Sequence, residues 1–117
     1  MTLIKNYEAE DANSQYLIAK AGTSDEKALK AGAAPANGLG VVCQPGDIEI
    51  GERMDVVLSG ETEVLCAGSI PTGSSFTSDS AGKAVLATTG QRATGIVLET
   101  GATDRIVRCM VAPHAAA

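Results

Sequence analysis

The sequence predicts an all-β fold: a small single-domain β-barrel or sandwich built from hairpins, with an extended N-terminal arm and at most one short helix. Apolar runs of strand length recur between turn residues at a spacing of about 8–12 residues, which is typical of all-β domains. The chain has 117 residues and thirteen glycines, several of which repeat at regular intervals. A chain of this length forms one hydrophobic core, so a second independent domain is not expected.

Residues 1–22 are interpreted as an N-terminal arm and first strand, and residues 23–117 as the β-domain. The arm begins with the apolar pair Leu3 and Ile4 and then becomes acidic, so it has too little apolar surface to pack alone. We expect it to lie against another surface. Only residues 24–31 suggest a helix, because Ser24 can serve as an N-cap and Gly32 as a stop.

Two glycine-rich segments of the β-domain, residues 46–68 and 68–90, form a repeat with a period of 22 residues. The glycines of the first are Gly46, Gly51, Gly60 and Gly68, and the same three intervals recur in Gly68, Gly73, Gly82 and Gly90. Each unit is predicted to be a β-hairpin that turns at its third glycine. Two copies are too few for a solenoid, so paired hairpins in a barrel or sandwich fit better.

The segments on either side of the repeat also predict strands. An apolar strand at residues 39–43 is followed by Pro45 and Gly46, which occupy the two central positions of a type II turn. After the repeat, residues 94–99 and 105–111 are two further strands, joined by the turn-rich residues 100–104.

The stretch SDSAGKA, residues 78–84, superficially resembles a nucleotide-binding P-loop. A P-loop requires a glycine five residues before the second glycine and a hydroxyl after the lysine. Thr77 and Ala84 occupy those two positions. We therefore predict a hairpin turn in which Asp79 bonds to the backbone, Gly82 adopts a positive φ, and Lys83 points to solvent.

Composition and charge exclude several kinds of partner. The net charge is −5, which argues against binding to a nucleic-acid backbone. No apolar run is long enough to cross a membrane, and the first residues lack the layout of a secretion signal, so synthesis in a host cytoplasm is expected. Aromatic residues make up only 3% of the chain, which disfavours a pocket for a small-molecule substrate.

The sequence offers no clear catalytic or metal-binding group, so we expect no enzyme activity, no cofactor and no metal. His114, the only histidine, lies in an alanine-rich tail that we expect to be frayed. Cys43, Cys66 and Cys109 lie in apolar runs and are interpreted as small buried hydrophobic residues. An alternative stays open: a small acidic hydrolase or carbohydrate-binding module that uses paired carboxylates. The candidate acids are Glu8, Glu10 and Asp11, Asp47 and Glu49, and Glu61 and Glu63.

Five segments resemble a family of small head proteins of tailed phages, the capsid decoration or cement proteins, including a capsid-cement-like group from prophages. They are YEAE at residues 7–10, YLIAK at 16–20, GERMDVVLSG at 51–60, FTSDSAGKAV at 76–85 and TGIVLE at 94–99. Phe76 and Ser80 replace the leucine and alanine usual in the family. The segments span most of the chain.

The resemblance implies a β-tulip-like domain on the outer face of a virion capsid, where it stabilises the head by bridging subunits of the major capsid protein. It further implies homotrimers at three-fold and quasi-three-fold positions, and an arm that adds to the capsid protein's sheet. Carried onto this chain, the capsid-binding arm comprises Thr2, Leu3, Ile4, Lys5, Asn6 and Tyr7. A self-assembling structural protein of the head or tail is a further possibility.

Overall fold

The computed structural model describes residues 2–32 and 38–116, and within them the chain forms strands and no helix. This confirms the all-β class. The strands are β1 (Leu3–Ala9), β2 (Asn13–Ser14), β3 (Ile18–Ala21), β4 (Lys27–Lys30), β5 (Gly38–Val42), β6 (Asp47–Ile48), β7 (Arg53–Leu65), β8 (Ser75–Ser78), β9 (Ala84–Leu86), β10 (Arg92–Val97) and β11 (Ile106–Ala115). All of them except β2 and β6, which form a separate two-stranded ribbon, belong to one continuous sheet.

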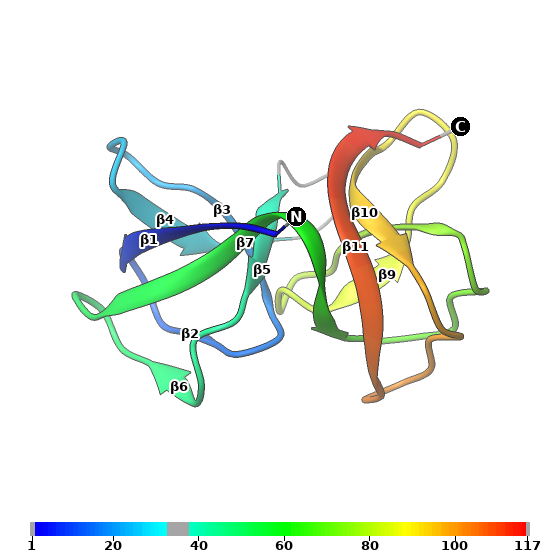
Figure 1. Ribbon diagram of the computed structural model, residues 1–117, viewed down its shortest axis with the longest axis horizontal. Helices are drawn as coiled ribbons and strands as arrows, with labels where there is room; N and C mark the ends of the chain where they lie inside the picture. Colours follow the sequence, from blue (N-terminus) through cyan, green and yellow to red (C-terminus); the bar gives the residue numbers. More distant parts are fainter. Residues whose placement is uncertain (1, 33–37, 117) are drawn as a thin grey trace.

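Five strands close into a small barrel in the order β1, β4, β3, β5 and β7, because β7 also pairs with β1. Figure 1 shows this barrel on the left, with the β2–β6 ribbon below it. The residues packed together here are mostly small or β-branched, as a narrow barrel requires. They are Tyr7, Ala9, Ala19, Ala28, Val42, Ile48, Met54 and Val56.

The other half of the sheet, which we call the curled sheet, runs from β7 through β11, β10 and β8 to β9. A bridge between Cys66, which follows β7, and Ala84 at the start of β9 brings the two ends of this sheet together. Phe76 is completely buried in its core and is surrounded by aliphatic side chains and by Cys66 and Cys109. The curled sheet lies on the right in Figure 1.

The long strand β7 belongs to both halves, and this corrects the first predicted hairpin. The hairpin predicts that residues 53–58 and 61–66 pair with each other across Gly60, but residues 53–65 form one strand. The first part pairs with β1 and β5, and the second pairs with β11. Gly60 has a φ of 112°. It therefore has the unusual backbone conformation that the glycine pattern indicated, but it allows a bend and not a reversal.

The predicted helix at residues 24–31 is also wrong. The Lys27 N–H donates to the Ser24 carbonyl, so the residues of the expected first helical turn close a β-turn. The chain then continues as β4, which pairs antiparallel with β3 and parallel with β1. Ala28, in the middle of β4, is fully buried in the barrel. Strand pairing on both edges outweighs a weak local helix preference.

The second predicted hairpin is present. Strands β8 and β9 pair antiparallel, with Ser78 opposite Ala84. Around the turn, Asp79 Oδ1 accepts hydrogen bonds from the N–H groups of Ala81 (2.8 Å) and Lys83 (2.9 Å). Gly82 has a φ of 80°, as this turn requires.

Candidate interaction surface

The predicted capsid-binding residues, Thr2 to Tyr7, lie at the start of the chain and in strand β1. They do not form a separate extended arm: β1 pairs antiparallel with β7, with Ile4 opposite Val57 and Tyr7 opposite Met54. The N-terminal segment was expected to lie against another surface, and strand β7 of the same chain provides that surface. Tyr7 is buried in the barrel, whereas Leu3 and Ile4 are 57% and 50% exposed.

One edge of β1 is open beyond the barrel. Strand β4 pairs with β1 only at Glu8 and Ala9, so residues 3–6 extend past it. The Glu8 N–H donates to the Glu26 carbonyl on this side, whereas the Ala9 N–H donates to Glu52 on the β7 side. Because main-chain groups alternate along an antiparallel pair, those of Ile4 and Asn6 point to the open edge. No described residue pairs with them there.

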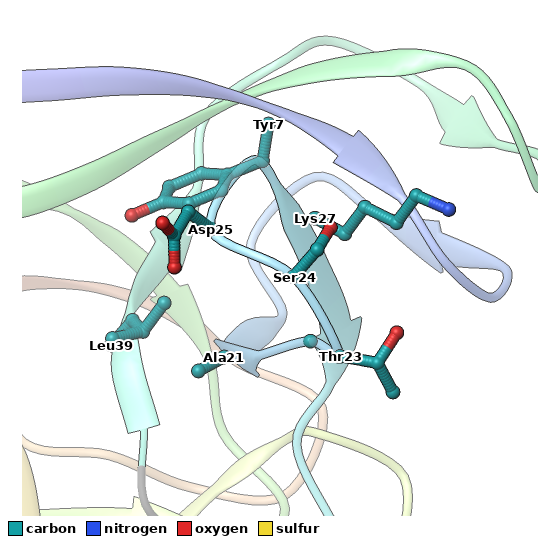
Figure 2. Close-up of a pocket in the computed structure, with 8 residues that line it drawn as sticks. Tyr7, Ala21, Thr23, Ser24, Asp25, Lys27 and Leu39 are labelled. Carbon is teal, nitrogen blue, oxygen red and sulfur yellow. The ribbon is translucent and has the colours of Figure 1, made fainter.

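A cavity of about 250 Å³ lies beside this edge, at the mouth of the barrel. Its lining comes from β1, from the end of β3 and the turn after it, and from the starts of β4 and β5: Tyr7, Ala21, Gly22, Thr23, Ser24, Asp25, Lys27 and Leu39. Figure 2 shows the Tyr7 ring, Leu39 and Ala21 as apolar walls. This grouping was not predicted, because Tyr7 and Leu39 are distant in the chain from residues 21–27 and meet them only in the folded barrel.

The charged groups of the cavity differ in direction. Asp25 is exposed, and in Figure 2 its carboxylate is drawn on the side of the cavity where Tyr7 and Leu39 lie, whereas the Lys27 amine extends away. Lys27 Nζ lies 3.8 Å from the Glu8 carboxylate. None of the ion pairs among the described residues involves Asp25. The Lys5 amine lies 5.1 Å from the centre of the Tyr7 ring, so this ring already accommodates a cation.

Several of the candidate carboxylates for a hydrolase make structural contacts within the chain. Glu10 accepts hydrogen bonds from the N–H and hydroxyl of Thr23, and these bonds lower the pKa of its carboxyl, with a further contribution from Lys27. Asp11 accepts a bond from the Lys30 N–H. Glu61 lies on the exposed face of β7, 3.6 Å from Arg108.

The expectation of a frayed tail around His114 is wrong, because β11 extends to Ala115 and the following residue bonds to Gln91. His114 Nδ1 lies 2.6 Å from the Ala112 carbonyl oxygen, which can only accept, so this nitrogen carries the proton. In the neutral ring, Nε2 then accepts from the Ser75 hydroxyl at 2.8 Å. No carboxylate contacts this exposed pair among the described residues, and we assign it no catalytic role.

Two of the three cysteines are buried as predicted: Cys66 and Cys109 are completely inaccessible. Cys43 is half-buried against the same core. Burial raises the pKa of all three thiols, and that of Cys109 reaches about 12. In the described part of the chain, no three metal-ligating side chains come together.

Lys83, the lysine of the P-loop-like stretch, lies 3.1 Å from the Asp104 carboxylate on the protein surface. Asp104 is 71% exposed. The lysine therefore joins two turns of the curled sheet by an exposed ion pair. The prediction that this stretch is a turn is confirmed by its hydrogen bonds and by the φ of Gly82.

No family model and no curated protein matches the chain. Among solved structures, the chain resembles the head fiber gp8.5 N base of bacteriophage phi29, with a TM-score of 0.68 over 96% of this chain and 95% of that chain. The two sequences are 17% identical. The two chains therefore share a fold over nearly their whole lengths.

The described residues contain no helix that is long and apolar enough to cross a membrane.

Proposed function

We propose that this chain is a structural protein of a phage head, and specifically a decoration protein on the outer face of the capsid. The observation that carries the proposal is the fold shared with the phi29 head fiber base across nearly the full length of both chains. The sequence segments that resemble capsid decoration proteins, including residues 51–60 and 76–85, support the same conclusion independently.

The proposed partner is the major capsid protein, and the proposed action is to bridge neighbouring capsid subunits. A protein that binds only the assembled lattice stabilises it by mass action, and each bound copy adds to the effect. The proposed contact is the exposed start of β1, where Leu3 and Ile4 present apolar side chains beside an open strand edge. Strand addition at such an edge supplies main-chain hydrogen bonds without a deep pocket. We further propose homotrimers at the three-fold positions.

We propose a role without catalysis. Glu10, Asp11 and Glu61 are engaged by neighbouring groups of the chain. The cavity beside β1 has a single aromatic wall, Tyr7, whereas a sugar-binding cleft is usually lined by several aromatic side chains.

The proposal is tested with heads of the encoding phage that have been prepared without this protein. Purified chain is added back, and occupancy and the temperature of head rupture are measured. Leu3→Asp with Ile4→Asp should reduce occupancy, because it places charge on the proposed contact, whereas Ile50→Asp should bind normally. Ile50 is 72% exposed and is a matched surface control. If wild-type chain does not bind heads or does not raise their rupture temperature, the decoration role is wrong. Light scattering after size exclusion measures the oligomeric state.

A further inference from the structure

The open edge of β1 and the adjacent cavity form a continuous surface with two complementary parts. The edge offers the main-chain N–H and C=O groups of Ile4 and Asn6. The cavity begins at the next inward-facing side chain, Tyr7. A strand laid along the edge would have alternate side chains on the face of β1 that carries Lys5 and Tyr7. One of these side chains would therefore be directed to the cavity.

The charge of the cavity favours a cationic side chain on the partner strand. The two charged lining residues of the cavity are Lys27, whose amine extends away and lies near Glu8, and the exposed Asp25, whose carboxylate has no described cation within ion-pair distance. Tyr7, Ala21 and Leu39 provide apolar contacts for an aliphatic stem. A lysine or arginine has this combination of an apolar stem and a cationic end. The net charge of −5 favours a basic partner over an acidic one.

We propose that this surface binds an extended segment of another protein, which pairs as a strand with residues 3–6 and inserts a lysine or arginine side chain between Tyr7 and Asp25. Main-chain bonds to the edge supply sequence-independent affinity, and the cavity supplies selectivity for a basic residue. The inference concerns the same edge as the proposed capsid contact and deepens it, because it names the chemistry of the segment that would pair there. It rests on the proposed function only for the identity of the partner, and its test uses no capsid.

The test uses the full chain and a synthetic peptide, acetyl-Ser-Val-Thr-Lys-Thr-Val-Ser-amide. Two matched peptides carry norleucine or glutamate in place of the lysine. Isothermal titration calorimetry measures affinity, and hydrogen exchange followed by NMR measures protection of the Ile4 and Asn6 amides. We expect the lysine peptide to bind about threefold more tightly than the norleucine peptide and to protect both amides, because an ion pair with an exposed carboxylate adds only modest affinity.

Variants of the chain separate the two parts of the surface. Asp25→Asn should abolish the preference for lysine over norleucine and leave the norleucine affinity unchanged. Glu26→Gln, an exposed carboxylate change on the same turn, should leave both affinities unchanged. Ile4→Pro removes an N–H from the open edge and should weaken all peptides equally. If this variant does not fold, the amide protection measured on wild-type chain still shows whether the peptide pairs as a strand with β1.

Several results would overturn the proposal. Absence of binding by the lysine peptide at millimolar concentration would do so. Equal affinities for lysine and norleucine, or a preference for glutamate, would refute the role of the cavity. Binding without protection of the Ile4 and Asn6 amides would refute strand pairing. None of these results depends on whether the chain binds phage heads, so the proposed function is tested separately.

Discussion

Gly60 on β7 lies opposite Val111 on β11, while the preceding residue of β7 lies opposite Leu3 on β1. One peptide bond thus separates the part of β7 that completes the barrel from the part that belongs to the curled sheet. The φ of 112° at Gly60 is in a region that residues with a Cβ rarely adopt. The continuity of the sheet through both halves therefore depends on a glycine at this position.

Replacing Gly60 by alanine should lower the free energy of unfolding by about 1–3 kcal/mol, the cost of holding a side-chain-bearing residue in a strained backbone conformation. Gly68→Ala is the control, because a Cβ there meets open space and the φ of Gly68 is not positive. Urea denaturation followed by circular dichroism measures both variants. Equal midpoints for the two would contradict the role assigned to Gly60.

The glycine pattern was informative about backbone conformation and misleading about topology. Two equivalent pairs, Gly51 with Gly73 and Gly60 with Gly82, have positive φ, as a repeat of backbone positions predicts. Gly68 departs from the repeat, because its equivalents Gly46 and Gly90 have positive φ and it does not. The two units nevertheless differ, because residues 61–65 pair with β11 instead of folding back on residues 53–58. The choice between a turn and a bend at Gly60 depends on that distant strand. A local pattern does not contain this information.

The class and most strands were predictable because apolar alternation and turn residues are local signals. The strands at residues 94–99 and 105–111, for example, overlap β10 and β11, which pair antiparallel. The candidate interaction surface was harder to predict from the sequence. The open edge of β1 exists because β4 begins opposite Glu8, and the cavity exists because Tyr7, Asp25 and Leu39 meet at the barrel mouth. Both depend on strand register, which is fixed only in the folded chain.

The turn between β8 and β9 should depend on Asp79 and not on Lys83. Asp79→Ala removes the acceptor of two main-chain hydrogen bonds and should lower the free energy of unfolding by about 1–2 kcal/mol. Lys83→Ala removes an exposed ion pair with Asp104 and should cost at most about 1 kcal/mol. Thermal denaturation compares the two variants.

Calorimetric titration with ATP tests the alternative function of the same turn. We expect no binding heat from wild-type chain, because the first glycine and the metal-binding hydroxyl of a P-loop are absent. An ATP affinity that is present in wild-type chain and lost in Lys83→Ala would show that this interpretation of the turn is wrong.

The exposed carboxylates of β7 should be dispensable. Glu61→Gln and Glu63→Gln should each change the free energy of unfolding by less than about 0.5 kcal/mol, as is usual for surface positions. Arg108, the partner of Glu61, also lies 3.9 Å from Glu99, so it keeps an anionic neighbour when Glu61 is replaced. Glycan-array binding and hydrolysis of model glycosides should be the same for wild type and both variants. A glycan or glycoside activity that either substitution removes would instead favour a carbohydrate-active protein.

The thiol of Cys109 should make the fold less stable at alkaline pH. Burial, with a smaller contribution from nearby Cys66, raises the pKa of this thiol from 9.0 to about 12. Between these two values the unfolded chain loses the proton while the folded chain retains it. The free energy of unfolding should therefore decrease with increasing pH across this window, by up to about 1.4 kcal/mol per pH unit. Below pH 9 the stabilisation is complete. Urea denaturation from pH 8 to 11 measures the slope.

Cys109→Ala removes the titrating group and should flatten this slope, at the cost of a small cavity in the core of the curled sheet. Cys43→Ala is the control, because Cys43 is only half-buried and should account for less of the dependence on pH. Iodoacetamide at pH 8 provides a second measurement: Cys109 should remain unlabelled in the native chain and react after unfolding in guanidinium, because only the thiolate is nucleophilic. Rapid labelling of Cys109 in the folded chain, or a slope unaffected by its replacement, would contradict the burial of this thiol.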